Sequence, residues 1–175
     1  MPHIPLSEDL PGIRGLLAFK PASGVTVAQL IEQLLRGDSP LSPADRERIA
    51  AHVSQLNECE FCARSHAATI PHLDPQVTPA GSVEATPRLN ALLDLAAEVT
   101  RGGRYVTSAT LARARAAGAG DEDIHDTVLI AAAFCMLNRY VDGLGAITPT
   151  DDAAYDEMGV RIAAHGYLGA APAIG

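Results

Sequence analysis

The chain is organised around residues 58–66, which read Glu-Cys-Glu-Phe-Cys-Ala-Arg-Ser-His. Within this stretch Cys59 and Cys62 form a Cys-x-x-Cys pair, and His66 follows the second cysteine by four positions. Helix residues three apart share a face at roughly 5 to 6 Å, which falls within the Cα separation of about 4.4 to 6.8 Å that a disulfide tolerates. The spacing therefore predicts a pair that cycles between dithiol and disulfide without unfolding.

A helix is expected to begin at this pair. Asn57 is a favourable N-cap residue, and Glu60 three positions later completes a capping-box pattern. Cys59 and Cys62 would then lie in the first two turns, where the positive end of the helix dipole favours thiolate over thiol. We therefore expect lowered pKa values and unusual reactivity for both sulfurs. His66 lies one turn beyond Cys62 on the same face, close enough to exchange a proton with its sulfur.

A second candidate residue, Glu47, lies on the preceding predicted helix. Ser42 and Pro43 are a typical cap and first-turn pair for that helix. Twelve residues separate Glu47 from Cys59, a distance of about 18 Å if one straight helix held both. A break at residues 56–58 would let the two helices fold back on each other. We expect this turn to bring the Glu47 carboxylate toward the sulfurs.

The remaining chain also favours helices. Four prolines in residues 1–25 predict an extended arm, which we expect to lie on a neighbouring subunit, and residues 71–87 predict a loop. Apolar residues recur at helical spacing elsewhere, with no clean alternation of the kind that strands show. The sequence predicts an all-helical protein, with further helices at residues 26–36, 87–101, 108–117, 121–142 and 151–165.

Length and composition narrow the class of protein. The 175 residues fit a single domain, 1–175, and the net charge of −8 argues against a nucleic-acid or anionic-membrane surface. The longest apolar run, residues 128–137, is too short to span a bilayer, and residues 1–9 do not resemble a secretory signal. Three cysteines, two of them in one Cys-x-x-Cys, are typical of a reducing compartment, so we expect a soluble cytoplasmic protein, with Cys135 a small core residue.

The pattern Glu47-x11-Cys59-x2-Cys62-x3-His66 resembles the alkyl hydroperoxidase D-like (AhpD-like), peroxidase-related branch of the carboxymuconolactone decarboxylase family. Similar family features surround it between about residues 40 and 145. They are the helix start at residues 41–43, the acidic turn at residues 118–124, and the polar residues Asn138, Arg139 and Asp142 near the end of the long helix. The spacing of Glu47, Cys59, Cys62 and His66 is the specific part of this resemblance, and the decarboxylases of the wider family lack the cysteine pair.

The resemblance implies an all-α fold with the Cys-x-x-Cys at the N-terminus of a core helix, assembled as a trimer or a hexamer. It implies a thiol peroxidase or disulfide oxidoreductase in antioxidant defence. Cys62 would attack a small hydroperoxide, Cys59 would resolve the product, and Glu47 and His66 would form a proton relay. No resident cofactor is implied; the reductant would be an external dithiol such as a lipoyl protein or a thioredoxin-like protein. This chain departs from the best-studied members in having Phe61 where they have a histidine.

Two alternatives stay open from the sequence. Cys59, Cys62 and His66 could be three ligands of a zinc site, with Glu47, His52 or His72 as the fourth. The chain could also be a helical oligomer whose cysteines sense oxidation once, without turnover. An enzyme would consume many equivalents of peroxide when supplied with dithiol, whereas a sensor would stop after one.

Overall fold

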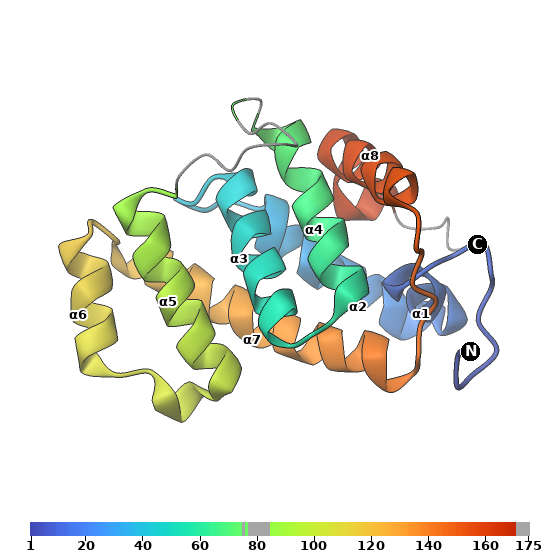
Figure 1. Cartoon of the computed structure of the whole chain (residues 1–175), viewed down its shortest axis with the longest axis horizontal. Coiled ribbons are helices and arrows are strands. Elements are labelled where there is room, and N and C mark those ends of the chain that lie inside the picture. Colours follow the sequence, from blue (N-terminus) through green and yellow to red (C-terminus); the bar gives the residue numbers. More distant parts are fainter. Residues whose placement is uncertain (75, 77–84, 171–175) are drawn as a thin grey trace.

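A computed structural model describes residues 1–74, 76 and 85–170, and the regular elements in these ranges are all helical. This confirms the all-α prediction. Eight α-helices and one 3-10 turn follow each other within these described ranges (Figure 1): α1 (Ile13–Phe19), α2 (Pro21–Arg36), α3 (Pro43–Leu56), α4 (Glu60–Leu73), α5 (Pro87–Arg101), η1 (Gly103–Tyr105), α6 (Ser108–Ala116), α7 (Asp121–Gly143) and α8 (Asp152–Ala170).

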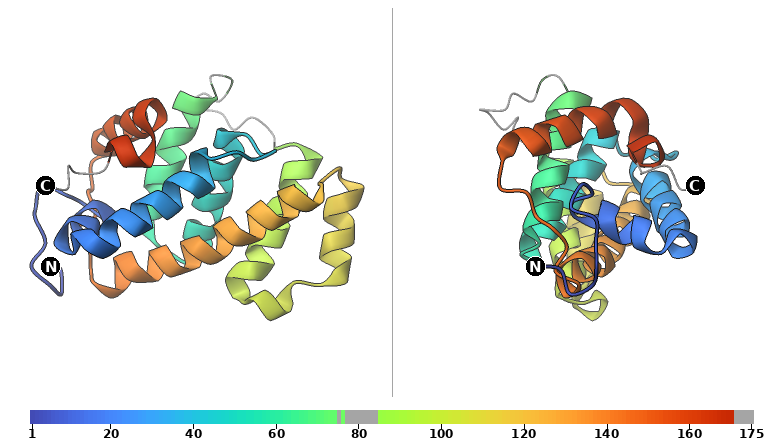
Figure 2. Two further views of the ribbon diagram at one scale, coloured as in Figure 1. Left: turned by 180° about the vertical axis from the view of Figure 1, so that it is seen from behind. Right: turned by 90° about the vertical axis from the view of Figure 1, so that its right-hand side faces the viewer.

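The long helix α7 runs along the length of the molecule, and α3 and α5 pack against it. Helix α4 lies beside α3 and is covered on its other side by α8, while α5 and α6 form the opposite end (Figures 1 and 2). One apolar cluster lies where α2, α3, α5 and α7 meet, and a second, which contains both cysteines, lies under α8 and α1. The Cys-x-x-Cys pair is therefore part of the folded core.

Local capping signals account for the predicted helix starts. The Ser42 hydroxyl accepts a hydrogen bond from the Asp45 amide at 3.1 Å, and the Thr86 hydroxyl accepts one from the Leu89 amide at 3.1 Å. These side chains satisfy amides that have no partner inside the helix. The starts of α3 and α5 are thus confirmed as predicted.

The predicted extended arm is wrong beyond Gly12. Helix α1 begins at Ile13, and Pro21 is the first residue of α2, where its missing N–H removes no helix bond. Residues 1–12 are non-helical, and they lie on their own chain: the His3 amide donates to the Leu144 carbonyl at 2.9 Å, and the Gly12 amide to the Ile147 carbonyl at 2.8 Å. A neighbouring subunit is not needed to hold this segment.

The observed ends of two helices, α4 and α8, differ from the predicted ends. Helix α4 continues through Pro71 to Leu73, so the predicted loop at residues 71–87 begins later, and much of it lies outside the described residues. Helix α8 continues past His165 to Ala170, and the rest of the Gly- and Ala-rich end lies outside them as well. Within the described ranges, no helix has both the length and the apolar character that crossing a membrane requires.

Candidate active site

A tight turn between α3 and α4 places the cysteines. Helix α3 ends at Leu56, Glu58 adopts a positive φ of 60°, and the Cys59 amide donates to the Ser54 carbonyl at 2.9 Å. Cys59 is therefore the N-cap residue of α4, and Cys62 lies in its first turn. The predicted break at residues 56–58 is confirmed, and it reverses the chain so that α3 and α4 lie side by side.

The predicted capping box is wrong in its residues. Asn57 ends α3 instead of beginning α4. Its side-chain amide donates to the side-chain oxygen Oδ1 of Asn138 on α7 at 2.9 Å and approaches the Cys135 sulfur at 3.5 Å. A tertiary polar contact has replaced the local cap that the sequence pattern favoured.

The turn brings Glu47 and His66 together. Glu47 Oε2 lies 2.6 Å from His66 Nδ1, and the two residues are 0% and 6% exposed. Because an ionised carboxylate only accepts, we place the imidazole proton on Nδ1. The other ring nitrogen, Nε2, then carries the lone pair that a base needs. The edge of the imidazole packs on the Phe134 ring, with the ring centroids 4.6 Å apart.

Two further residues, Arg36 and Tyr167, complete the site and were missed by the sequence analysis. Arg36 donates from a terminal guanidinium nitrogen to Glu47 Oε1 at 2.6 Å. The Tyr167 hydroxyl lies 2.8 Å from the same oxygen and 3.1 Å from His66 Nδ1. Glu47 therefore accepts from three side chains supplied by α2, α4 and α8.

Tyr167 reaches the site because α8 bends. Gly166 has a φ of 66°, a conformation that glycine adopts without steric strain. Beyond this kink, Glu32 Oε2 on α2 accepts from the backbone amides of Tyr167 at 2.6 Å and Leu168 at 3.3 Å. A glycine followed directly by tyrosine in an Ala-rich tail was the available signal. Arg36 gave none, because a basic residue in a last helical turn is ordinary.

Burial and neighbouring charges set the ionisation of this cluster. Burial alone would raise the pKa of Glu47, but the charge and hydrogen bond of His66, followed by those of Arg36, hold the pKa below its ordinary value. Burial, then the negative charge of Glu47, raises the pKa of Tyr167 well above 10.0. Glu47 is therefore a carboxylate and Tyr167 a neutral phenol that donates to it.

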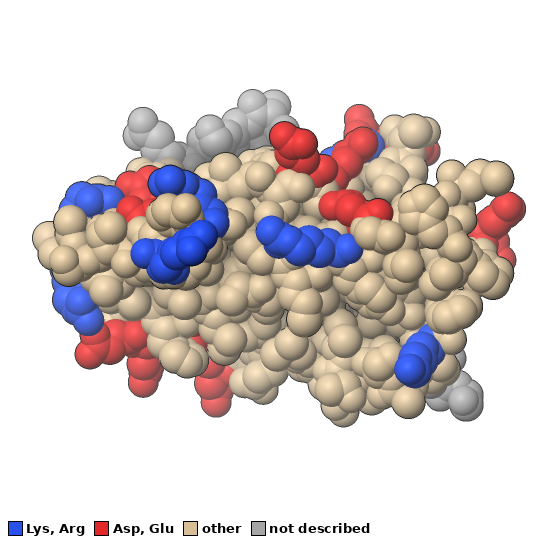
Figure 3. Space-filling model, turned by 90° about the horizontal axis from the view of Figure 1, so that it is seen from below, with Lys and Arg blue, Asp and Glu red and all other residues tan. Residues whose placement is uncertain are grey.

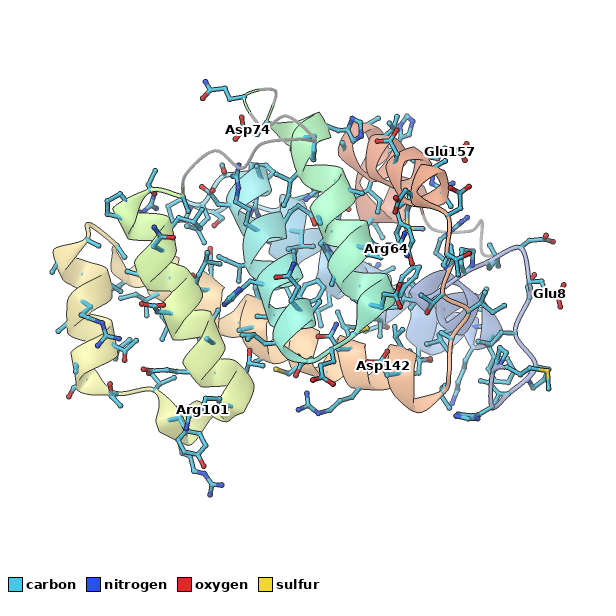
Figure 4. All side chains as sticks on the ribbon, in the orientation of Figure 1. Glu8, Arg64, Asp74, Arg101, Asp142 and Glu157 are labelled. Carbon is cyan, nitrogen blue, oxygen red and sulfur yellow. The ribbon has the colours of Figure 1, made fainter. Side chains whose placement is uncertain are left out.

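Both cysteines are free thiols deep in the molecule, 0% exposed at Cys59 and 4% at Cys62. A hydrogen bond with the Cys62 sulfur, followed by burial, raises the pKa of Cys59. Asp142 on α7, labelled in Figure 4 near the start of α4, raises this pKa further. The expectation of a lowered pKa is therefore wrong for Cys59, which keeps its proton while hydrogen-bonded to Cys62.

A cavity of about 60 Å³ opens beside the cluster. Cys62, His66 and Tyr167 line one part of it, together with Phe61, and Cys59 does not. The remaining wall comes mainly from apolar side chains of α1, α2, α7 and α8. The cavity therefore gives a small apolar molecule access to Cys62 and to the imidazole in the same place.

The zinc alternative finds no support in the geometry. Among the residues that the structure describes, no three His, Cys, Asp or Glu side chains are arranged to hold a metal ion. His66 is bonded to Glu47, and His72 pairs with Asp156 at 3.0 Å on the surface. His66, Glu47 and His72, three of the candidate zinc ligands, are thus used in other contacts.

Comparisons with known proteins support the family resemblance. A sequence profile of the carboxymuconolactone decarboxylase family matches residues 21–70, the stretch that contains Glu47, Cys59, Cys62 and His66. A solved structure of a peroxidase-related protein from Silicibacter sp. is 28% identical, with a TM-score of 0.71, over 83% of this chain and 78% of that one. The AhpD-like resemblance is confirmed.

A second solved structure supports the same resemblance. It is the alkylhydroperoxidase AhpD core of a peroxidase-related protein from Ralstonia eutropha, 25% identical with a TM-score of 0.70. The match covers 86% of this chain and 81% of that one. Among curated proteins, none matches the chain. The AhpD-like fold thus extends over most of this chain, well beyond the stretch that the family profile matches.

Proposed function

We propose that the protein is a thiol-dependent peroxidase that reduces small organic hydroperoxides with its Cys-x-x-Cys pair. The observation that carries the proposal is the buried Glu47–His66 pair at a cavity that Cys62 also lines. The two peroxidase-related relatives support the same class of reaction.

In the proposed reaction, the Cys62 sulfur attacks the terminal oxygen of ROOH. The O–O bond breaks, Cys62 becomes a sulfenic acid, and ROH leaves. His66 takes the thiol proton on Nε2 and returns it to the leaving oxygen, while Glu47 stabilises the charged imidazole. The protonated Cys59 thiol then condenses with the sulfenic acid, which forms the Cys59–Cys62 disulfide and releases water.

An external dithiol closes the cycle by reducing the disulfide to two thiols and becoming a disulfide itself. Lipoyl and thioredoxin-like proteins are the proposed reductants, and no resident cofactor is needed. We also propose a homo-oligomer, a trimer or a hexamer. The exposed apolar residues Leu129 and Met136 on α7 are available for contacts between subunits. Because the cysteine pattern is typical of a reducing compartment, the proposed location is the cytoplasm.

The first test is the mass of the peptide that carries Cys59 and Cys62. Reduced protein is exposed to one equivalent of tert-butyl hydroperoxide and then alkylated without reductant. We expect this peptide to lose two hydrogens while Cys135 is still alkylated. In the Cys59→Ser variant the sulfenic acid on Cys62 should persist and be trapped by dimedone. If both thiols are alkylated after exposure to peroxide, the proposal fails.

A one-shot redox sensor is the competing function, and the burial of Cys59 favours it because a buried disulfide is slow to meet a reductant. Turnover decides between the two. An enzyme consumes many equivalents of hydroperoxide when dithiothreitol is present, and Cys62→Ser abolishes this consumption. A sensor stops after one equivalent for each chain.

A further inference from the structure

Two arginines share the cavity with the proposed catalytic residues. Arg14 comes from α1 and Arg161 from α8, and both line the cavity together with Cys62, His66 and Tyr167. Each arginine is half-buried, and its guanidinium Nε atom is fully buried without a hydrogen-bond partner. Two cationic groups thus lie at a wall that is otherwise mainly apolar.

The Nε atoms of Arg36 and Arg46 are also buried without a partner, so Arg14 and Arg161 differ from the other arginines in the described ranges through the rest of the guanidinium group. Every other arginine that is buried or half-buried donates to a carboxylate or a backbone carbonyl: Arg36, Arg46, Arg48, Arg64 and Arg88. Neither Arg14 nor Arg161 makes a hydrogen bond or an ion pair within the part of the chain that the structure describes. Proteins pair charges that they withdraw from water, so the natural partner of these two groups is an anion from outside the chain.

The two charges are also close enough to act on each other. Burial, followed by the positive charge of Arg161, lowers the pKa of Arg14. An anion placed between the two guanidinium groups would remove this repulsion and satisfy their free donors. The fork of N–H donors on each arginine fits the two oxygens of a carboxylate.

The other residues that line the cavity indicate what kind of molecule would fit beside the two arginines. Ile13, Leu17, Ile31, Leu137 and Met158 present only carbon and sulfur to the cavity. The Ser65 hydroxyl, another polar group at the wall, already donates to the Phe61 carbonyl at 2.7 Å. The wall therefore suits an apolar chain with one compact charged head, because few donors remain for the additional oxygens of a phosphate.

We propose that the substrate is a carboxylate-bearing alkyl hydroperoxide, whose carboxylate pairs with Arg14 and Arg161 while its O–O bond lies at Cys62. This inference rests on the proposed peroxidase function and names its substrate class. The apolar wall holds the alkyl body of the substrate. The arginines bind and orient the substrate and take no part in proton transfer.

A binding measurement tests the pairing without any turnover. Hexanoate and 1-hexanol, which carry no peroxide, are titrated into the reduced full-length protein by isothermal calorimetry. We expect hexanoate to bind at least about tenfold more tightly than hexanol, and added salt to weaken only hexanoate. Arg14→Gln and Arg161→Gln should each remove most of this preference, and Arg14→Lys should keep part of it. Equal affinity for the two ligands in the unaltered protein would overturn the inference.

Arg101→Gln is the matched control. Arg101 is exposed in the last turn of α5, far from α1 and α8, as its label in Figure 4 shows. Basic side chains gather over this end of the molecule, where α5, η1 and α6 lie (Figure 3). The substitution removes the same charge but should leave the binding of hexanoate unchanged. A loss of binding equal to that of Arg14→Gln would mean that net charge alone attracts the anion, which overturns the inference.

Turnover separates this inference from the proposed function. We expect kcat/KM for a hydroperoxide with a terminal carboxylate to exceed that of its uncharged counterpart at least about tenfold, and Arg161→Gln to abolish this preference. Turnover of both at one rate would refute the substrate class and leave the peroxidase in place. Absence of any turnover would refute the peroxidase. A smaller oligomer mass for Arg14→Gln and Arg161→Gln would show that the two arginines pair with another subunit, which also overturns the inference.

Discussion

The Tyr167 hydroxyl lies 2.8 Å from Oε1 of Glu47, although 120 positions separate the two residues in the chain. Glu47 already bonds His66 through its other oxygen. The Tyr167 hydroxyl also lies 3.1 Å from Oε2 of Glu47 and 3.1 Å from Nδ1 of His66, so it contacts both members of the pair, and it reaches that place only through the kink at Gly166. The last described helix is part of the candidate site, as are the helices around the cysteines.

Replacing this phenol tests its contribution. In Tyr167→Phe the ring remains and only the hydroxyl is lost, so Glu47 keeps Arg36 and His66 as donors. We expect kcat/KM for tert-butyl hydroperoxide to fall about tenfold, the effect of one lost hydrogen bond to a charged group. The rate is followed as peroxide consumption in the presence of dithiothreitol, across a range of pH. Tyr105→Phe, at an exposed tyrosine, is the control. An unchanged rate and pH profile would limit Tyr167 to packing.

Removing the central charge should affect stability. Glu47→Gln leaves the buried donors of Arg36, His66 and Tyr167 facing an amide, and breaking a buried ion pair in this way lowers the free energy of unfolding by about 3 kcal/mol. Urea unfolding near pH 7, followed by circular dichroism, measures this difference. Glu157→Gln, at an exposed carboxylate of α8, should change the stability little. A loss below about 1 kcal/mol for Glu47→Gln would contradict the importance assigned to the pair.

The stability difference between the unaltered protein and Glu47→Gln should depend on pH. The native pKa of Glu47 is lowered relative to its ordinary value of 4.5, so the carboxylate stabilises the fold above that pH. This stabilisation is lost as the pH falls below 4.5 through the native pKa. The difference in unfolding free energy between the unaltered protein and Glu47→Gln should therefore narrow on acidification from about pH 5 to pH 3. A gap that stays constant would show that the charge of Glu47 does not stabilise the fold.

Because Cys59 keeps its proton, we expect the two cysteines of the pair to react with an alkylating reagent at different rates. Because its hydrogen bond to Cys62, then burial, raises the pKa of Cys59, this sulfur should be alkylated by iodoacetamide at least about tenfold more slowly than Cys62 at pH 8. Peptide mass after timed quenching gives both rates. Asp142→Asn removes a carboxylate that raises this pKa, so it should speed the alkylation of Cys59.

Unfolded protein supplies the reference for this order. In guanidinium chloride both thiols are exposed, and Cys59 and Cys62 should react at similar rates. Faster alkylation of Cys59 than of Cys62 in the native protein would reverse the proposed roles of the two sulfurs.

The turn before the cysteines carries strain that a substitution can relieve. Glu58 is exposed and has a φ of 60°, a conformation that disfavours residues with a Cβ. Glu58→Gly should therefore raise the free energy of unfolding by about 0.5 to 1 kcal/mol. Gln55→Gly, in the last turn of α3, should lower it by about 1 kcal/mol. A destabilised Glu58→Gly would show that the side chain itself supports the turn.

Local signals predicted much of the fold and of the site. Ser42 and Thr86 mark helix starts because a cap depends on neighbours three residues away, which are visible in the sequence. The break at residues 56–58 was sufficient to expect that the helices of Glu47 and His66 fold back on each other, whereas the pairing of these two side chains came from the family resemblance.

Other parts depend on contacts between distant segments. Asn57 looked like a cap, but its side chain bonds Asn138 across the core. Tyr167 and Arg36 join Glu47 only after α8 and α2 have packed around it. The prolines before residue 25 were interpreted as breakers, whereas Pro21 begins a helix. Side-chain partners chosen by tertiary packing leave little trace in a sequence pattern.

The packing of Phe61 against Gly12 limits which substitutions positions 12 and 61 can accept. At position 61, where the family resemblance implies a histidine, the Phe61 ring occupies the space that a Cβ on Gly12 would need, with Phe61 Cζ only 2.0 Å from that point. Gly12 also has a φ of 58°, which few other residues tolerate. A histidine at position 61 would place ring nitrogens against the Gly12 backbone and the Tyr155 ring, in an apolar layer. Substitutions at positions 12 and 61 are therefore coupled. Relatives that carry the histidine should differ from this chain at both positions.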